Sequence, residues 1–466
     1  RTYVGDIMDM KRIAVIGGGP AGYTAAIQAA QLGGQVTLIE KDALGGTCLN
    51  RGCIPTKALL HSANVFWKTK HSTELGLNVD NVSMDYPKAL KRTQEVVKRL
   101  VGGLGSLMVK NKITVIEGSA YFKGSSNVYL EETDSPVEAD SIVIAAGSKV
   151  KTVPIEGIDG SRVIGSNEAL VLPELPKSAV VIGGGAIGLE FAQMWNRMGA
   201  SVAVVEVMPQ LIPGEDVEIA EILKARLIEE GVRVYTGAKV NSIMEEKDKA
   251  LVSFVYESGD GQEFGEYVLL AVGREPATDG LGLNEAGINV QNGAIVVGNN
   301  MQTNIDNVYA AGDVTGGVML AHVAMAEAKC AVHNAFGEAV TPGRSAVPRC
   351  VYSIPEVASV GLTQEQASAK HDRVKIGKFP FLANGRSLVL GETIGMAKVV
   401  ADAKHGEILG VHIIGPGASE LIAEAVLAIQ LEATVEDLAS TIHAHPTLSE
   451  VTMEAALGVG GRSIHI

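Results

Sequence analysis

A run of apolar residues followed by closely spaced glycines occurs twice in the chain. In the first copy, apolar residues 13–16 precede Gly17, Gly19 and Gly22, and an alanine-rich stretch leads to a second apolar run that ends in Glu40. This order predicts a strand, a glycine turn, a helix, a second strand and an acid. It is the pattern of a βαβ unit that binds a dinucleotide.

The second copy begins with apolar residues 179–182, which precede Gly183, Gly185 and Gly188, and its second apolar run ends in Glu206. In both copies the acid lies 23 positions after the first glycine, close to the spacing of about 20 that the motif requires. The repetition predicts two bound dinucleotides, each with its pyrophosphate at a helix N-terminus.

Glu206 also bears on which dinucleotide is bound. A carboxylate there accepts hydrogen bonds from a free ribose 2′-hydroxyl and repels a 2′-phosphate. Residues 207–215 contain no Lys or Arg to hold a phosphate. Unless Glu206 is a solvated surface acid, the second copy prefers NAD over NADP.

The remaining pattern divides the chain further. A long helix is expected at 87–112, short strands at 113–143, a proline-punctuated linker at 154–176, and apolar runs alternating with amphipathic helices from about 347 onward. We predict an α/β fold with two Rossmann-like dinucleotide-binding domains and a C-terminal α+β domain. The predicted boundaries are 11–150, completed by 275–346, for the first domain, 151–274 for the second and 347–466 for the third.

Composition narrows the class of partner. The formal net charge of −14 disfavours a nucleic-acid phosphate or an anionic membrane surface as a partner. No apolar run reaches about 18 residues, and residues 1–10 lack the apolar core of a signal peptide. We therefore expect a cytoplasmic protein, or a mitochondrial matrix protein in a eukaryote, with neither membrane nor nucleic-acid partner. No metal site is expected.

Two of the four cysteines, Cys48 and Cys53, lie five positions apart. A regular helix would separate their Cα atoms by roughly 7.5 Å, whereas a disulfide needs about 4.4–6.8 Å. A bridge therefore requires a break in the helix, and Gly52 permits one. Because so short a loop adds little stability, a bridge here favours redox chemistry. The spacing alone also suits two buried, inert thiols.

A second group of reactive residues lies near the C-terminus, where His443, His445, Pro446 and Glu450 follow one another closely. Histidine suits general base work near neutral pH, and a carboxylate a few residues away can orient its ring. Taken alone, these histidines also suit surface or capping positions.

Thiols and two dinucleotides together imply thiol–disulfide exchange coupled to hydride transfer. A thiol cannot pass a hydride to nicotinamide directly, but a flavin can accept two electrons from a thiolate and pass a hydride to nicotinamide. One dinucleotide should therefore be FAD, which carries the flavin, and the other NAD, which carries the nicotinamide. The cysteines follow Glu40 closely, so the first copy should hold FAD.

The motifs at 45–55 (Gly-Gly-Thr-Cys-Leu-Asn-Arg-Gly-Cys-Ile-Pro) and 443–450 (His-Ala-His-Pro-Thr-Leu-Ser-Glu) closely resemble those of the pyridine nucleotide–disulfide oxidoreductase family. The resemblance extends from about Lys11 to the C-terminus. It implies oxidation of protein-bound dihydrolipoamide to lipoamide, with reduction of NAD⁺ to NADH. His445, oriented by Glu450, would deprotonate a substrate thiol, Cys48 would exchange with that thiol, and Cys53 would lie beside the flavin.

The resemblance also implies further cofactor contacts. Around FAD it places Lys57 (paired with Glu190), Ala120, Ala146, Gly147, Ser148, Asp313, Met319, Leu320, Ala321 and His322. Around NAD it places Gly183, Gly185, Gly188, Glu190, Glu206, Val240 and Gly273. The departures are Ala120, where glycine is frequent, Arg51, which adds a cation between the cysteines, and Ala277, where an Asn commonly follows the proline.

The partners implied are a second copy of the chain, a lipoyl-bearing carrier domain or H protein, and the acyltransferase core of a 2-oxoacid dehydrogenase complex. The C-terminal domain would build the dimer, with His445 acting across it. A glutathione-type reductase is disfavoured because it carries basic residues where Glu206 stands. A mercuric reductase is disfavoured because that enzyme adds a cysteine pair at its C-terminus, whereas the last cysteine of this chain is Cys350. A flavoprotein scaffold without turnover would need neither the cysteine pair nor the His445–Glu450 pair.

Overall fold

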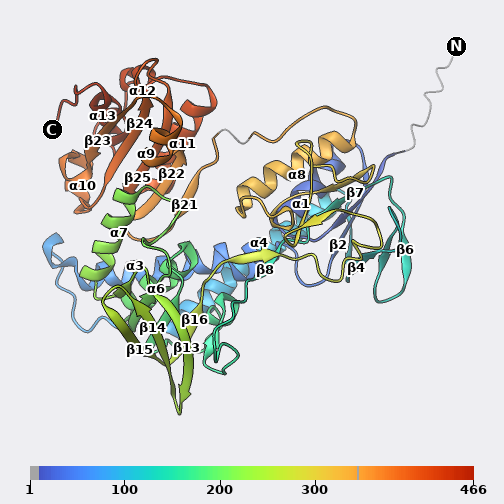
Figure 1. Ribbon diagram of the computed structural model, residues 1–466, viewed down its shortest axis with the longest axis horizontal. Coiled ribbons are helices and arrows are strands. Elements are labelled where there is room, and N and C mark those ends of the chain that lie inside the picture. The colour runs from blue at the N-terminus through green and yellow to red at the C-terminus, as the bar shows by residue number, and fades with distance from the viewer. Residues whose placement is uncertain (1–9, 344–345) are drawn as a thin grey trace. The chain divides into compact units, whose positions relative to one another are not determined.

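The computed structural model describes residues 10–343 and 346–466. These residues form two compact units, each made of three segments of the chain. Figure 1 shows the chain coloured by residue number. The first unit comprises residues 10–58, 91–151 and 273–343, and the second comprises 59–90, 152–272 and 346–466. Two helices, α3 (Cys53–Lys70) and α4 (Tyr86–Lys110), run from one unit into the other.

The first unit is built on a parallel sheet of order β20-β7-β1-β2-β3. Alternate residues of its strands enter two different cores. Ile13 and Val15 pack toward the alanine faces of α1 and α8, while Ala14 and Ile16 pack toward β4 and β5. The sheet strands are β1 (Arg12–Ile16), β2 (Gln35–Glu40), β3 (Thr114–Glu117), β7 (Ser141–Ile144) and β20 (Val308–Ala310).

Short elements complete the first unit. The helices are α1 (Pro20–Gln31), α2 (Gly46–Arg51), η2 (Asp313–Thr315) and α8 (Ala321–Ala335). The small antiparallel strands are β4 (Ala120–Phe122), β5 (Val128–Leu130), β6 (Ser135–Val137), β8 (Ser148–Val150), β17 (Arg274–Pro276), β18 (Val290–Gln291) and β19 (Ala294–Ile295).

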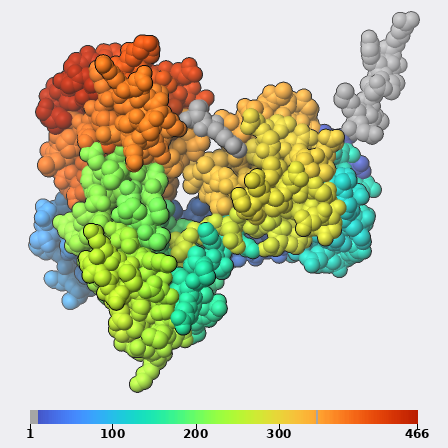
Figure 2. Space-filling model, in the orientation of Figure 1, coloured from blue at the N-terminus to red at the C-terminus, as the bar shows by residue number. Residues whose placement is uncertain are grey.

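The second unit contains a parallel sheet of order β12-β11-β10-β16-β9. One face packs against α6 and α7, and the other packs against the antiparallel sheet β13-β14-β15, which projects at the bottom of Figures 1 and 2. The strands are β9 (Val163–Ile164), β10 (Ser178–Ile182), β11 (Ser201–Val205), β12 (Arg233–Tyr235), β13 (Lys239–Glu246), β14 (Lys249–Tyr256), β15 (Gly259–Gly265) and β16 (Tyr267–Leu270). The helices are η1 (Ser72–Leu75), α5 (Ser166–Ala169), α6 (Ala186–Met198) and α7 (Val217–Glu229).

The C-terminal part of the second unit is a five-stranded antiparallel sheet of order β21-β22-β25-β24-β23. Helices α11 and α13 cover one of its faces. The strands are β21 (Arg349–Val351), β22 (Glu356–Gly361), β23 (Val374–Pro380), β24 (Met396–Asp402) and β25 (Ile408–Gly415). The helices are α9 (Gln364–Lys370), η3 (Phe381–Ala383), α10 (Gly385–Leu390), α11 (Ala418–Gln430), α12 (Val435–Ser440) and α13 (Glu450–Val459).

The other face of this sheet carries buried polar groups that meet the N-terminus of α7. Lys398 donates to both carboxylate oxygens of Asp216 at 2.9 Å and to Glu218 at 2.5 Å. Burial would raise the pKa of Asp216, but its bonds to Lys398 outweigh that effect and lower it. For His412, a base, burial lowers the pKa, and its Nε2 donates to the Leu362 carbonyl. This polar layer fixes α7 to the C-terminal sheet.

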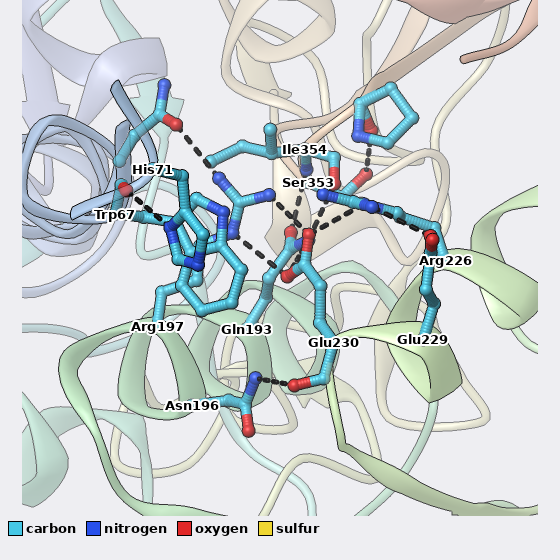
Figure 3. Close-up of polar contacts among 12 residues, drawn as sticks. Trp67, His71, Gln193, Asn196, Arg197, Arg226, Glu229, Glu230, Ser353 and Ile354 are labelled. Atoms are coloured by element: carbon cyan, nitrogen blue, oxygen red, sulfur yellow. Dashed lines mark hydrogen bonds and ion pairs between the residues drawn. The ribbon is translucent and has the colours of Figure 1, made fainter. Parts of the chain in front are cut away.

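A buried ion pair joins three further segments of the second unit (Figure 3). Arg197 of α6 forms a bidentate pair with Glu230, at 2.9 and 2.5 Å, and donates to Asn64 of α3 at 2.8 Å. Its guanidinium lies 5.3 Å from the centroid of the Trp67 ring. Gln193 exchanges two hydrogen bonds with the backbone of Ile354. The helix that follows the second glycine turn is thereby fixed to α3 and to the C-terminal sheet.

The predicted fold class is confirmed, including both βαβ patterns and the C-terminal α+β domain. The sheet β13-β14-β15 is an addition that the sequence reading missed. The predicted domain boundaries stay predictions. Residues 1–9, on which most of the expectation about a signal peptide rests, and residues 344–345 of the predicted central segment lie outside the described part. Within 10–343 and 346–466, no helix combines the length and apolarity needed to cross a membrane.

The Arg197–Glu230 pair gives a stability prediction. Replacing Arg197 with Met removes the bidentate partner of the Glu230 carboxylate, which is 1% exposed, while Arg226 of α7 still pairs with it at 2.8 Å. Because charge-assisted hydrogen bonds are lost but the carboxylate keeps a cation, we expect the free energy of unfolding of the second unit to fall by about 1.5–3 kcal/mol. Urea unfolding followed by tryptophan fluorescence measures it, because Trp67 and Trp195 both lie in this unit.

The matched control is Arg462→Met, in the same unit. Arg462 pairs with Glu436, and both side chains are more than half exposed, so a loss below about 1 kcal/mol is expected. Equal losses in the two variants would contradict the account of the buried pair.

Candidate active site

The first glycine turn lies where β1 and β7 diverge in the parallel sheet of the first unit. A Cβ atom on Gly22 would lie 1.7 Å from the carbonyl oxygen of Gly17, and one on Gly17 would lie 2.3 Å from that of Ala145. Gly17 also has φ +101°, which side chains rarely adopt. The carboxyl ends of β1 and β7 form the crevice in which parallel sheets bind ligands.

The second glycine turn repeats this geometry within the second unit. A Cβ on Gly188 would lie 2.0 Å from the carbonyl oxygen of Gly183, and one on Gly183 would lie 2.3 Å from that of Ala271. The turn again lies between two strands, β10 and β16, at the point where the strand order reverses. The two turns therefore meet the same steric requirement by the same means.

Both acids at the strand ends hold the backbone of their own glycine turn. Glu40 accepts hydrogen bonds from the N–H groups of Gly18 at 2.5 Å and Asp42 at 2.8 Å. Glu206 accepts them from Gly184 at 2.5 Å and Met208 at 2.7 Å. Burial raises the pKa of Glu40, although the Gly18 N–H opposes this.

The turns fit a dinucleotide. Helices α1 and α6 begin after Gly19 and Gly185, and neither N-terminus is capped by a side chain. Their first-turn N–H groups and positive dipole ends therefore suit a pyrophosphate. No side chain fills the space in front of Gly185, where a Cβ would meet nothing within 4 Å.

The cysteines lie on either side of a helix break. Helix α2 ends at Arg51, Gly52 adopts φ −140° and ψ −111°, and α3 begins at Cys53. The break falls at the glycine where the sequence allowed one. Both cysteines are thiols in this structure. A hydrogen bond between the thiols raises the pKa of Cys48, burial adds to the effect, and Lys57 opposes it.

The turn that carries the cysteines is fixed directly to the first glycine turn. The Gly45 N–H donates to the Gly18 carbonyl at 2.8 Å. A Cβ on Gly46, which has φ +54°, would lie 2.7 Å from the Cα atom of Gly19. The first glycine turn and the thiol pair therefore form one structural element.

The loop after β7 adds a polar group to the same sheet edge. Ser148 donates to Asp313 at 2.5 Å, and Arg274 donates to the hydroxyl and the carbonyl oxygen of Ser148 at 2.7 Å each. Burial lowers the pKa of Arg274. Ser148 and Asp313, far apart in sequence, are thus in direct contact.

His445 and Glu450 form a hydrogen-bonded pair in the second unit. His445 Nδ1 lies 2.9 Å from Glu450 Oε1, and the Thr447 N–H donates to Oε2 at 2.8 Å. Burial would raise the pKa of Glu450, but its bonds to Thr447 and His445 outweigh that effect and lower it. With Nδ1 donating to the carboxylate, Nε2 is left to accept a proton. The His445 side chain is 78% exposed.

The other predicted residues lie as follows. In the first unit, Lys57 lies on α3, Ala120 begins β4, Ala146 and Gly147 follow β7, Met319 and Leu320 lead into α8, Ala321 and His322 begin it, and Gly273 precedes β17. In the second unit, Glu190 lies buried on α6, where it accepts the Tyr352 N–H at 3.1 Å, and Val240 lies on β13. The pairing of Lys57 with Glu190 and the place of Gly273 at the NAD site stay predictions, because each joins residues of different units.

Two residues near the site were not predicted. Tyr23 of α1 is half-buried, and burial followed by the charges of Cys48 and Cys53 raises its pKa. Glu327 of α8 is buried and accepts the Gly312 N–H at 2.9 Å. The sequence signals that could have pointed to them are weak: Tyr23 is a tyrosine in the first turn of an alanine-rich helix, and Glu327 is an acid in a mostly apolar helix. Among the described residues, no group of three or more His, Cys, Asp or Glu side chains is arranged to hold a metal ion.

Two dinucleotide turns, one of them joined to a pair of thiols, define a redox protein of the disulfide oxidoreductase class. Residues 11–328 match the family model "Pyridine nucleotide-disulphide oxidoreductase", and residues 347–456 match the dimerisation domain of the same family. The chain therefore belongs to the pyridine nucleotide–disulphide oxidoreductase family, as predicted.

Relatives match over nearly the full length. A dihydrolipoyl dehydrogenase of Bacillus subtilis is 43% identical, with 97% of this chain and 99% of that protein covered. One of Geobacillus stearothermophilus is 42% identical, with 99% of each covered. Among solved structures, LpdA of Mycobacterium tuberculosis has a TM-score of 0.88 at 29% identity, with 96% and 99% coverage. The HOCl-induced flavoprotein disulfide reductase RclA of Escherichia coli has a TM-score of 0.86 at 30% identity, with the same coverage.

The glycine geometry gives a prediction for cofactor binding. Gly22→Ala places a methyl group against the Gly17 carbonyl and distorts the first turn, so the purified protein should retain several-fold less flavin per chain. Absorbance of the flavin released on denaturation measures this. The control is Gly102→Ala on α4, also in the first unit, where a Cβ meets nothing within 4 Å. Full flavin content in Gly22→Ala would show that the turn does not hold the cofactor.

Proposed function

We propose that the protein is an FAD-dependent enzyme that oxidises protein-bound dihydrolipoamide to lipoamide and reduces NAD⁺ to NADH. The observation that carries this is the attachment of the Cys48–Cys53 turn to the first glycine turn, through the Gly45–Gly18 hydrogen bond and the Gly46–Gly19 contact. Relatives named dihydrolipoyl dehydrogenase, 41–43% identical over at least 97% of the chain, supply the substrate class.

The residues divide the thiol chemistry among them. His445 Nε2 accepts a proton from one thiol of the substrate, and Glu450 stabilises the imidazolium that forms. The substrate thiolate attacks the Cys48 sulfur of the oxidised pair, so a mixed disulfide forms and Cys53 leaves as a thiolate. The second substrate thiol then displaces Cys48, which releases lipoamide and leaves both cysteines reduced.

The raised pKa of Cys48 fits the state that follows. In the reduced pair the two thiols share a hydrogen bond, so Cys48 holds its proton. The chemistry that a bound FAD would supply here is two-electron acceptance from the thiol pair and hydride donation to the nicotinamide of NAD⁺. The residues proposed to hold FAD are Gly17, Gly19, Gly22, Glu40, Lys57, Ala120, Ala146, Gly147, Ser148, Asp313, Met319, Leu320, Ala321 and His322.

NAD is assigned to the second turn. Glu206 is 6% exposed and holds the turn through two N–H groups, so it is not a solvated surface acid. Its carboxylate suits a free ribose 2′-hydroxyl and disfavours a 2′-phosphate. Gly183, Gly185, Gly188, Glu190, Val240 and Gly273 complete the proposed NAD site.

The substrate assignment gives a kinetic prediction. The FAD-loaded protein mixed with dihydrolipoamide and NAD⁺ should produce NADH, with kcat/KM about tenfold or more above the value with NADP⁺, because the 2′-phosphate meets a buried carboxylate. Cys48→Ser should abolish this turnover, because no disulfide can form, and should leave the flavin bound. Absorbance of NADH and of flavin measures both.

Two outcomes would count against the assignment. No NADH from FAD-replete protein would favour a flavoprotein scaffold. Loss of flavin in Cys48→Ser would mean that Cys48 supports the cofactor site rather than the reaction. Cys330→Ser, at a buried cysteine bonded to the Val340 carbonyl, is the matched control and should retain turnover.

The proposed assembly is a homodimer built by the C-terminal domain, with His445 serving the cysteine pair of the other copy. The proposed partners are a lipoyl-bearing carrier domain or H protein and the acyltransferase core of a 2-oxoacid dehydrogenase complex. The net charge of −14 suits a basic subunit-binding domain of that core.

We expect binding of that basic domain to weaken as the salt concentration rises, which calorimetry at two ionic strengths measures. Binding that is indifferent to salt would exclude a charge-driven dock.

A further inference from the structure

A second histidine–acid pair lies one residue away from the proposed base. His443 Nε2 lies 2.7 Å from Oε1 of Glu424 on α11, and His443 Nδ1 lies 2.9 Å from the Thr441 carbonyl. The His443 side chain is only 6% exposed, in contrast to the 78% exposure of His445. Only Ala444 separates the two histidines.

The segment from Thr441 to Glu450 needs such an attachment. Within one chain the His445 ring is 78% exposed, so contacts of its own chain do little to fix its position. At the other end of the segment, Asn384 donates to the Thr447 carbonyl at 3.0 Å, and Thr447 donates to the carbonyl of Ala444 through its hydroxyl at 2.7 Å. The Glu424–His443 pair is the corresponding attachment on the N-terminal side of His445.

We propose that Glu424 and His443 are positioning residues that clamp this segment to α11 and so hold His445 where it can take a proton from the substrate. The inference rests on the proposed function. The clamp is specific in its chemistry. The Thr441 carbonyl can only accept, so Nδ1 of His443 must donate to it. The ionised carboxylate of Glu424 can likewise only accept, so Nε2 donates to it in the wild type, and a side chain at position 424 must bond to Nε2 for the clamp to close.

This requirement separates a clamp from a general structural role. In Glu424→Ala the clamp is lost, because no side chain bonds to His443 Nε2. In Glu424→Gln the clamp is kept, because the amide N–H can donate to Nε2 of a neutral His443 while Nδ1 still donates to the Thr441 carbonyl. His443 also acts on the acid that orients the base, since it contributes, after the larger effects of Thr447 and His445, to the lowered pKa of Glu450.

The experiment compares wild type, Glu424→Ala and Glu424→Gln as FAD-loaded full-length proteins. We expect kcat for dihydrolipoamide oxidation to fall about tenfold in Glu424→Ala, part of the 10²–10⁴-fold that a well-placed base contributes. Glu424→Gln should recover most of the loss. The KM for NAD⁺ and the rate of dye reduction by NADH, which do not use His445, should stay within about twofold of wild type in both variants.

The control variant is Glu338→Ala, which removes the acid of the exposed His333–Glu338 pair in the first unit (2.9 Å) and should leave every rate unchanged. Hydrogen exchange of peptides covering 441–450, read by mass spectrometry, should speed up in Glu424→Ala and return to the wild-type rate in Glu424→Gln.

The outcomes are distinguishable. Wild-type kcat in Glu424→Ala, failure of Glu424→Gln to restore it, or a parallel fall in dye reduction would overturn the clamp. If the wild type does not oxidise dihydrolipoamide, the proposed function is wrong. Hydrogen exchange then decides the clamp alone, and unchanged exchange in Glu424→Ala would overturn it.

Discussion

The contact between two glycine turns is the constraint on which the site depends. Gly45 donates to Gly18, and Gly46 lies so close to Gly19 that position 46 has no room for a side chain. The thiol pair is thereby attached to the turn that fits the first dinucleotide, and not merely placed near it along the chain. A redox reaction between sulfur and a bound cofactor requires such a fixed, short separation.

Elsewhere the fold uses two kinds of support, namely acids that hold the glycine turns and buried ion pairs that hold the helices. Each glycine turn lies where a parallel sheet reverses its strand order, and each is held by an acid at the end of the next strand. In the second unit, buried charges have partners of opposite sign, among them Arg197 with Glu230 and Lys398 with Asp216. These pairs fix α6 and α7 to neighbouring segments, which holds the second glycine turn on a rigid support.

Much of this was readable from the sequence, because it depends on local patterns. The glycine spacing with Glu40 and Glu206 predicted both βαβ units, and Gly52 marked the break between α2 and α3. Contacts between distant segments were not readable. Nothing in the sequence indicates that Ser148 meets Asp313 and Arg274, that Tyr23 lies near the cysteines, or that Glu424 reaches His443, because each depends on how separate elements pack. The sheet β13-β14-β15, whose strands cover a face of the parallel sheet, was missed although a β-branched and aromatic run at 251–256 precedes the turn residues Ser258 and Gly259.

The most direct test of the account is whether electrons pass between the nicotinamide and the thiol pair. The FAD-loaded protein, oxidised in air, is incubated without oxygen with or without NADH and then alkylated with iodoacetamide, and each cysteine is read by mass spectrometry. The account predicts that NADH makes Cys48 and Cys53 alkylatable and leaves the labelling of Cys330 and Cys350 unchanged. Equal labelling of Cys48 and Cys53 with and without NADH would contradict it.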